Sequence, residues 1–144
     1  MKKQLQPHGG VLNTPVSLQQ LVSNLVSGFL PAATHHHTQL VNEVRQEIAL
    51  GAQNQSALAV ISDLLNTVVA NSCNGEIHIS ADRYRDVLIL NIEERNNYNG
   101  YALAYSVGAI EPAAASAGGH ISVSGPQKKI ITITFSFPDS SQAA

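Results

Sequence analysis

Residues 56–80 read SALAVISDLLNTVVANSCNGEIHIS, and this stretch decides the fold. In its first half the apolar side chains recur at steps of three and four residues, which predicts one buried helix face made of Leu58, Ile61, Leu65 and Val68. Asn74-Gly75 should end the helix, because both residue types readily adopt left-handed backbone. The polar-apolar alternation of 76–80 is typical of a half-buried strand. We therefore expect a buried helix that runs directly into a strand.

The composition indicates one domain with a sizeable core and few charges. Of the 144 residues, 44% are hydrophobic and 12% are charged, about half the usual charged share, and the net charge is −2. Without a basic surplus, we expect no nucleic-acid partner. No apolar run has the length of a membrane span, and a polar segment follows Lys2-Lys3, so neither a membrane anchor nor a signal peptide is expected.

Cysteine and histidine usage gives no sign of a metal site. Cys73 is the only cysteine, which excludes an intrachain disulfide, favours a cytoplasmic location and is more typical of a core-rim residue than of a reactive thiol. Three adjacent histidines, 35–37, cannot all face one ion from regular structure. We interpret them as part of a polar connector and predict no metal site.

The N-terminal half is expected to form helices and short strands around the stretch quoted above. Residues 1–13 are predicted to be a flexible arm. A helical stripe runs from Leu18 to Phe29, with Ser17 as its N-cap and Pro31 as its end. Strands are expected at 38–44 and 48–50.

The C-terminal half is expected to supply most of the sheet. After strand 76–80 we expect a charged hairpin at 81–86, a central strand at 87–92, a polar loop at 93–100, helices at 101–109 and 112–117, strands at 120–124 and 129–137, and a disordered tail at 139–144. This order predicts an α+β fold: a two-layer α/β sandwich whose mixed, mostly antiparallel sheet is covered on one face by helices. The domain is expected to span 14–138.

Five strings in this order resemble the ATP-binding domain of sensor histidine kinases, the GHKL-type histidine-kinase-like ATPases. They are PVSLQQLV (15–22), LVNEV (40–44), SDLLNT (62–67, against N-L-L-x-N-A), GGHISVS (118–124, against G-G-x-I-x-V-x-S) and TITFSFP (132–138). The resemblance covers about 15–138, and it implies the fold of that domain.

The resemblance also places a nucleotide cleft, with altered residues at its key positions. In active members an Asn on the long helix holds Mg²⁺; Thr67 stands at that position, and Asp63 stands at the preceding Asn of the pattern. The adenine-binding Asp of the D-x-G-x-G loop falls on Glu94, and its glycines fall on Asn96 and Tyr98. A hydroxyl lacks the amide carbonyl, and a tyrosine would fill the purine pocket. Asp63, Thr67 and Glu94 are therefore predicted to border a vestigial cleft.

The phosphate-binding part of the pattern is altered as well. Counting back from Gly118-Gly119, the glycine-rich turn falls on 104–107, Ala-Tyr-Ser-Val, without either glycine. Backbone N–H groups at a helix start bind phosphate, and side chains there would block it. Residues 94–101 leave room for only a short turn in place of the mobile lid. The motif of a phosphoacceptor histidine does not follow His37, and no catalytic residue is predicted.

Three functions are compatible with these residues. The favoured one is a degenerate domain that acts in signal transduction by binding a protein, such as a response regulator or a kinase, without kinase activity, with nucleotide binding weak or lost, and with no cofactor. The alternative is an ATP/ADP-binding domain of a two-component phosphorelay that uses Asp63 or Thr67 for Mg²⁺ and Glu94 for adenine. A third is an unrelated sandwich with an apolar ligand between Tyr98, Tyr101 and Tyr105. Small residues in 102–117 would also permit a homodimer.

Overall fold

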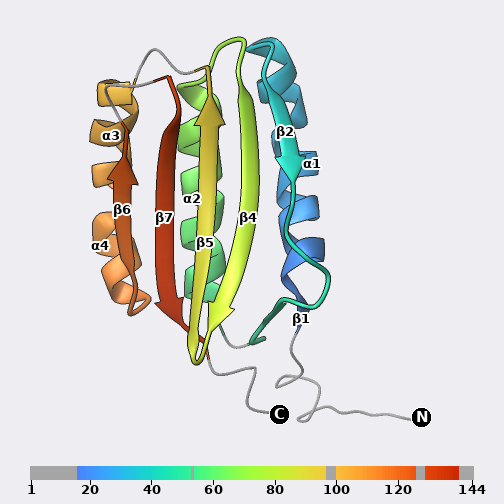
Figure 1. The fold of residues 1–144 in the computed structure, drawn as a ribbon, viewed down its shortest axis with the longest axis vertical. Coiled ribbons are helices and arrows are strands. Elements are labelled where there is room, and N and C mark those ends of the chain that lie inside the picture. Colours follow the sequence, from blue (N-terminus) through green and yellow to red (C-terminus); the bar gives the residue numbers. More distant parts are fainter. Residues whose placement is uncertain (1–15, 53, 97–99, 126–128, 140–144) are drawn as a thin grey trace, which may run out of the picture.

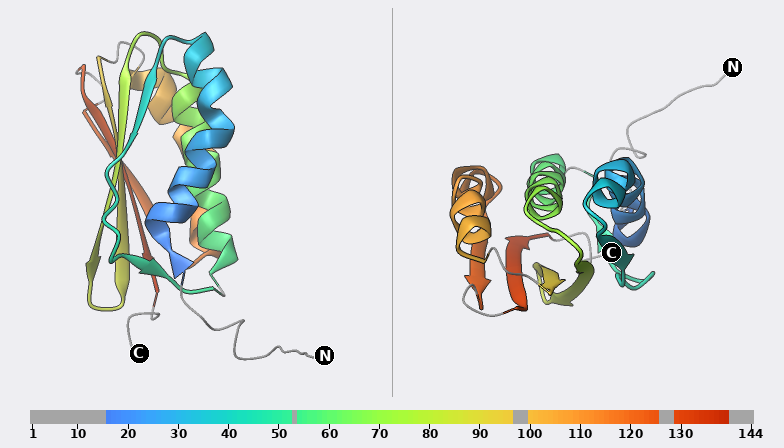
Figure 2. Two further views of the ribbon diagram at one scale, coloured as in Figure 1. Left: turned by 90° about the vertical axis from the view of Figure 1, so that its right-hand side faces the viewer. Right: turned by 90° about the horizontal axis from the view of Figure 1, so that it is seen from above.

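Two layers form the fold, a sheet and the helices that cover one of its faces (Figure 1, Figure 2). The computed structural model describes residues 16–52, 54–96, 100–125 and 129–139. The elements in chain order are β1 Val16–Ser17, α1 Leu18–His35, β2 Gln39–Asn42, β3 Ala49–Leu50, α2 Gln55–Ala70, β4 Glu76–Tyr84, β5 Val87–Arg95, α3 Gly100–Gly108, α4 Glu111–Ser116, β6 His120–Ser124 and β7 Ile131–Pro138.

The main sheet has five strands in the order β2-β4-β5-β7-β6. Strand β2 runs parallel to β4, and the other neighbours are antiparallel, with Ile79 opposite Ile92 and Leu90 opposite Phe135. A separate two-stranded pair joins β1 to β3. The predicted α+β sandwich with a mixed, mostly antiparallel sheet is confirmed, and the predicted central strand is β5.

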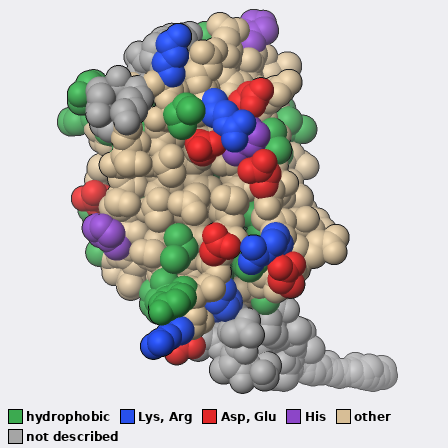
Figure 3. Space-filling model, in the orientation of Figure 1, with side chains coloured by type: hydrophobic (Ala, Val, Ile, Leu, Met, Phe, Trp, Pro, Cys, Tyr) green, Lys and Arg blue, Asp and Glu red, His purple; other side chains and the backbone are tan. Residues whose placement is uncertain are grey.

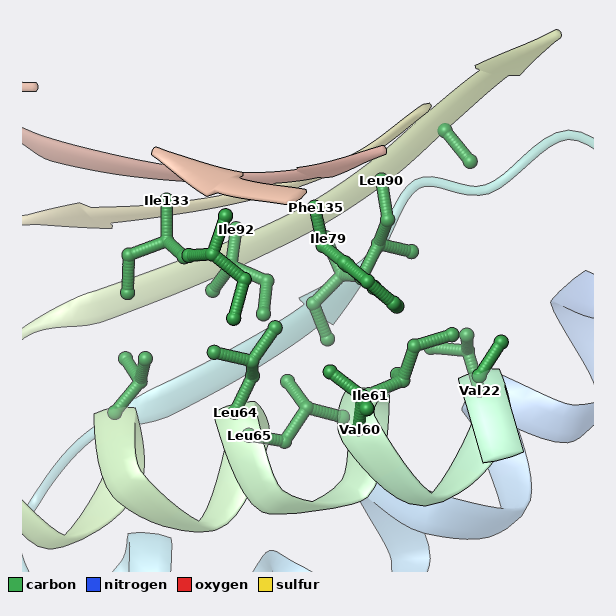
Figure 4. Close-up of a cluster of buried hydrophobic side chains, with 14 of the residues drawn as sticks. Val22, Val60, Ile61, Leu64, Leu65, Ile79, Leu90, Ile92, Ile133 and Phe135 are labelled. Carbon is green, nitrogen blue, oxygen red and sulfur yellow. The ribbon is translucent and has the colours of Figure 1, made fainter. Parts of the chain in front are cut away.

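The core lies between the sheet and α2, the middle helix of the helical layer (Figure 2). Figure 4 shows side chains of α2 directed at the sheet, where they meet side chains from three strands: Ile61, Leu64, Leu65, Ile79, Ile92, Ile133 and Phe135. These residues are essentially fully buried, and burial of each such side chain stabilises the fold by roughly 1.5–3 kcal/mol. The helix and the strand formed by residues 56–80 therefore bury their apolar faces against each other.

The sequence predicts that the first helix ends at Pro31, and this prediction is wrong. Helix α1 continues through Pro31 to His35. A proline inside a helix costs about 3 kcal/mol, because it removes one hydrogen bond and crowds the preceding turn. Ala33 is fully buried beyond it, and its carbonyl accepts a 2.8 Å hydrogen bond from the Thr38 N–H. Tertiary packing thus holds the last helical turn, so residues 32–35 of the predicted connector are helical and His36-His37 form the turn that follows.

Strands β4 and β5 are longer than predicted. The expected charged hairpin is reduced to a turn around Arg85, which has a φ of 57°, and β5 extends to Arg95. Glu93 and Glu94 therefore belong to a strand, and the prediction of a polar loop at 93–100 is wrong for them. The reason is cross-strand pairing, because Ile77 of β4 and Ile131 of β7 flank Glu94 on both sides.

The ends of the chain add one correction. Residues 1–13, the predicted arm, and 140–144, most of the predicted tail, lie outside the described residues. Asp139, placed in the tail by the sequence, is buried and accepts hydrogen bonds from Arg83 and from the Gly51 N–H. The fold thus extends one residue past Pro138. Within the described ranges, no helix is both long enough and apolar enough to cross a membrane.

Candidate functional site

Asp63 and Thr67 lie one turn apart on α2 and so share one flank of the helix. Asp63 is exposed and Thr67 is half-buried. The flank position follows from the apolar face of α2, which faces the core and leaves these side chains at its border. The Thr67 carbonyl accepts a 2.8 Å hydrogen bond from the Asn71 amide at the helix end. The helix therefore places the predicted metal position at the rim of the core.

Glu94 occupies the end of β5 and is only 1% exposed. It lies on the same strand face as Leu88, Leu90 and Ile92, all of them buried, so its side chain enters the layer between sheet and helices. A Cβ built on Gly75 would lie 3.3 Å from Glu94 Oε2 and 3.0 Å from Ser72 Oγ. The carboxylate is therefore directed at the turn that joins α2 to β4.

That turn is part of a polar network that sequence reasoning missed. The buried hydroxyls of Thr38 and Ser72 lie 3.0 Å apart, and His36 Nδ1 lies 2.9 Å from the Ser72 carbonyl. The Asn96 amide donates to the Asn74 carbonyl at 2.9 Å. No sequence spacing signals this network, because its members come from segments more than twenty residues apart. Within the described part of the chain, no group of three metal-ligating side chains is present.

Residues 104–107, which the resemblance matches to the family's glycine-rich turn, are helical, as the predicted helix at 101–109 implies. These residues lie inside α3, which begins at Gly100. The helical structure is interrupted between α3 and α4, where the Ile110 N–H donates a hydrogen bond to the Val107 carbonyl. The start of α3, where backbone N–H groups lack helical partners, falls instead at the buried Gly100.

The connection from β5 to α3 is short, as predicted. Strand β5 ends at Arg95 and α3 begins at Gly100, so only residues 96–99 join them. Asn96 adopts a φ of 66°, a left-handed conformation that Asn tolerates better than most residues. Tyr98, predicted to fill the purine pocket, lies outside the described residues.

Two tyrosines expected around an apolar ligand do not line a cleft. Tyr101 is 70% exposed and Tyr105 is 87% exposed, so both side chains extend into solvent from α3. A hollow of about 330 Å³ is found elsewhere, bordered by Val87, His120 and Ser136. Val87 starts β5 and Glu94 lies near its end, so this hollow is at the opposite end of the strand from the predicted cleft.

The charges gather on the uncovered face of the sheet (Figure 3). His78 lies 3.0 Å from Glu43 Oε2 and 3.0 Å from Glu76 Oε1. The hydrogen bond to His78 lowers the pKa of Glu76, and the same bond raises the pKa of His78 against the opposing effect of burial. Arg95 pairs with Glu93 at 2.8 Å, a bond that raises the pKa of the Arg95 guanidinium. Glu76 and His78 alternate with the buried Ile77 and so lie on the face away from Glu94.

Solved structures with the same arrangement are catalytic domains of histidine kinases. The Acinetobacter baumannii histidine kinase AdeS superposes with a TM-score of 0.71 at 13% identity over 87% of this chain and 66% of that one. The nucleotide-free catalytic domain of histidine kinase ThkA gives 0.70 at 12% identity over 92% and 99%. ThkA in complex with the response regulator protein TrrA gives 0.62 at 15% identity over 92% and 43%.

These similarities show that the chain has the fold of the histidine kinase ATPase domain. The chain spans 66% of AdeS and 43% of the ThkA chain in the complex, so it corresponds to one part of those proteins. No protein-family profile matches the sequence. No curated protein matches it either.

Proposed function

We propose that this chain acts in signal transduction as a histidine-kinase-like ATPase domain that binds another protein, lacks kinase activity, and binds nucleotide weakly or not at all. The observation that carries the proposal is the position of residues 104–107 inside α3. Backbone N–H groups in a helix interior donate to carbonyls four residues back and are not available to a phosphate. Side chains project where the family's pattern has glycines.

Other features of the cleft support the loss of nucleotide binding. Neither α2 nor α3 contains Lys or Arg, and phosphate recognition needs cations or positioned N–H donors. The Glu94 carboxylate is buried and directed at the turn beside Gly75. Residues 96–99 are too few to form a long lid over a nucleotide.

The proposed partner is a response regulator or a histidine kinase. ThkA, which shares this fold, is known in complex with the response regulator TrrA, and this analogy supports a partner of the same class. A cytoplasmic location fits such a partner, and it fits a chain with a single cysteine.

A second function, an ATP/ADP-binding domain of a two-component phosphorelay, is favoured by one observation. Gly100 is the first residue of α3, and a helix start without a side chain lets an anion approach the free N–H groups. In this case the oxygen atoms of Asp63 or Thr67 would serve Mg²⁺, and Glu94 would accept a hydrogen bond from adenine.

Calorimetric titration with ADP and ATP, each with and without Mg²⁺, separates the two functions. We expect no binding at millimolar nucleotide. Micromolar binding that is lost in Glu94→Gln, while the matched exposed substitution Glu111→Gln keeps it, would establish the second function instead. The unfolding midpoint of each variant shows whether a loss of binding reflects a loss of fold.

A further inference from the structure

Strand β6 is an outer strand of the main sheet and has a neighbouring strand on one side only (Figure 1). It pairs with β7 in a continuous antiparallel register, from His120 opposite Ser136 to Ser124 opposite Thr132. In an antiparallel pair, only every second residue directs its backbone N–H and C=O groups at the neighbouring strand. Among the described residues, no backbone hydrogen bond joins 120–124 to any segment other than β7. The remaining backbone groups of β6 are therefore available to a further strand.

This edge lacks the features that commonly prevent one sheet from pairing with another strand. Natural edge strands are protected by charged residues, by proline or by bulges. Strand β6 has the sequence HISVS, without Lys, Arg, Asp, Glu or Pro, and its register with β7 contains no bulge. The opposite edge strand, β2, differs because charged residues follow it at Glu43, Arg45 and Glu47. Strand β6 is thus the less protected edge of the sheet.

The helix-facing side of this edge has an apolar side chain that is still partly exposed. Helix α4 packs on β6 and lies over it (Figure 2, right). Val123 alternates with the exposed Ser122 and Ser124, so it faces the helical layer, but it is only partly buried there. A strand beside β6 would cover Val123 if its own side chains on that face were apolar.

A second copy of this chain does not fit this edge. Two antiparallel β6 strands related by a two-fold axis would place both helical layers on the same face of the joined sheet. Neighbouring strands lie about 4.8 Å apart, so the two α4 helices, each over its own β6, would have their axes only about 5 Å apart. Packed helices need about 8–10 Å between their axes. The occupant is therefore a strand without a helix above it, which an extended segment of another protein provides.

We propose that an extended segment of a partner protein pairs with β6 as a further strand of the main sheet, with alternate apolar side chains directed at the helical layer beside Val123. The backbone of the segment supplies the hydrogen bonds, and the alternation of its side chains supplies the specificity. This inference deepens the proposed function, because it rests on the binding of another protein. It does not depend on whether nucleotide is bound.

A peptide with the sequence of residues 130–138, IITITFSFP, is the probe, because β7 already pairs with β6 and has the required alternation. A short polyethylene glycol tail keeps the peptide soluble. Amide hydrogen exchange of the full isotope-labelled chain, measured by NMR with and without millimolar peptide, locates the contact. We expect the exchange of alternate amides in 120–124 to slow by about tenfold or more. The amides of β2, at the other edge, should exchange as before.

Two controls separate strand pairing from unspecific apolar contact. The same peptide N-methylated at the backbone nitrogens of residues 132–135 has no N–H donors there and should give no protection. Val123→Lys should also prevent binding, because it places a charge on the helix-facing side of the edge. The matched variant Val41→Lys changes a half-buried valine of β2 and should bind as the wild type does.

The thermal midpoint shows whether each variant is folded, and if Val123→Lys is not, the N-methylated peptide decides. Unchanged exchange in 120–124 overturns the proposal, and so does equal protection by the N-methylated peptide or protection confined to β2. None of these outcomes alters the nucleotide titration. A failure of this inference is therefore distinguishable from a failure of the proposed loss of nucleotide binding.

Discussion

The carboxylate of Glu94 lies against Gly75, so that a Cβ on Gly75 would be 3.3 Å from Glu94 Oε2 and 2.9 Å from the Arg95 carbonyl oxygen. The second contact involves backbone, which cannot move aside cheaply. This position joins the end of the central strand to the turn after α2. These close contacts explain why residue 75 is a glycine although the φ of Gly75 is not positive.

Gly75→Ala is expected to destabilise the fold by about 1–3 kcal/mol, because the added methyl group forces the β5 backbone and the Glu94 side chain to shift. Urea unfolding measures the change. Gly28→Ala is the matched control: nothing lies within 4 Å of its Cβ position in α1, so this change should stabilise the helix by up to about 1 kcal/mol. Equal effects of the two substitutions would contradict the close contact at Gly75.

Asp139→Ala is expected to cost about 3–5 kcal/mol, because it leaves the Arg83 side chain, only 9% exposed, without its carboxylate partner at 2.8 Å. Chemical denaturation provides the measurement. Glu47→Ala removes the partner of Arg45 in an exposed pair and should cost no more than about 1 kcal/mol. If the two changes cost the same, Asp139 does not anchor the end of the sheet.

His78→Gln should reduce stability more in mildly acidic than in alkaline solution. The folded-state pKa of His78 is raised, so its stabilising bonds to Glu43 and Glu76 are fully present below the unfolded pKa and lost as pH rises through the folded pKa. The pKa of Glu76 is lowered, so the contribution of the Glu76 carboxylate to the stability of the fold is lost only as pH falls through that lowered pKa. Denaturation of wild type and variant across the pH range measures the difference, with the exposed His120→Gln as control.

Thr67→Asn restores the amide that active members carry at the metal position, and we expect it to leave Mg²⁺-ATP binding undetectable by calorimetry. The reason is that the N–H groups of 104–107 remain bonded within α3. Gain of micromolar binding in this variant would show that the metal ligand alone had limited affinity. The proposal about α3 would then have to be abandoned.

Much of the fold was predictable because local patterns agree with tertiary packing. The three-four period around Leu65, the alternation around Ile77 and the β-prone run after Val87 each lie in the element predicted for them. The misplaced boundaries have one cause in common. Burial of Ala33 carries α1 past Pro31, and pairing with β4 and β7 carries β5 through Glu94. Local signals for a helix end or a loop were outweighed by contacts with distant segments.

For the candidate site, too, some properties follow from the sequence and others only from the tertiary structure. The sequence by itself determined which residue types stand at the family's positions, namely Thr67, Asp63 and Glu94, and therefore which ligand atoms are available. Only the tertiary structure decided that Glu94 is buried against Gly75 and that Tyr101 and Tyr105 are exposed. The physical reason is that burial and hydrogen bonding of a side chain depend on which distant segments pack beside it, and a local pattern does not contain that information.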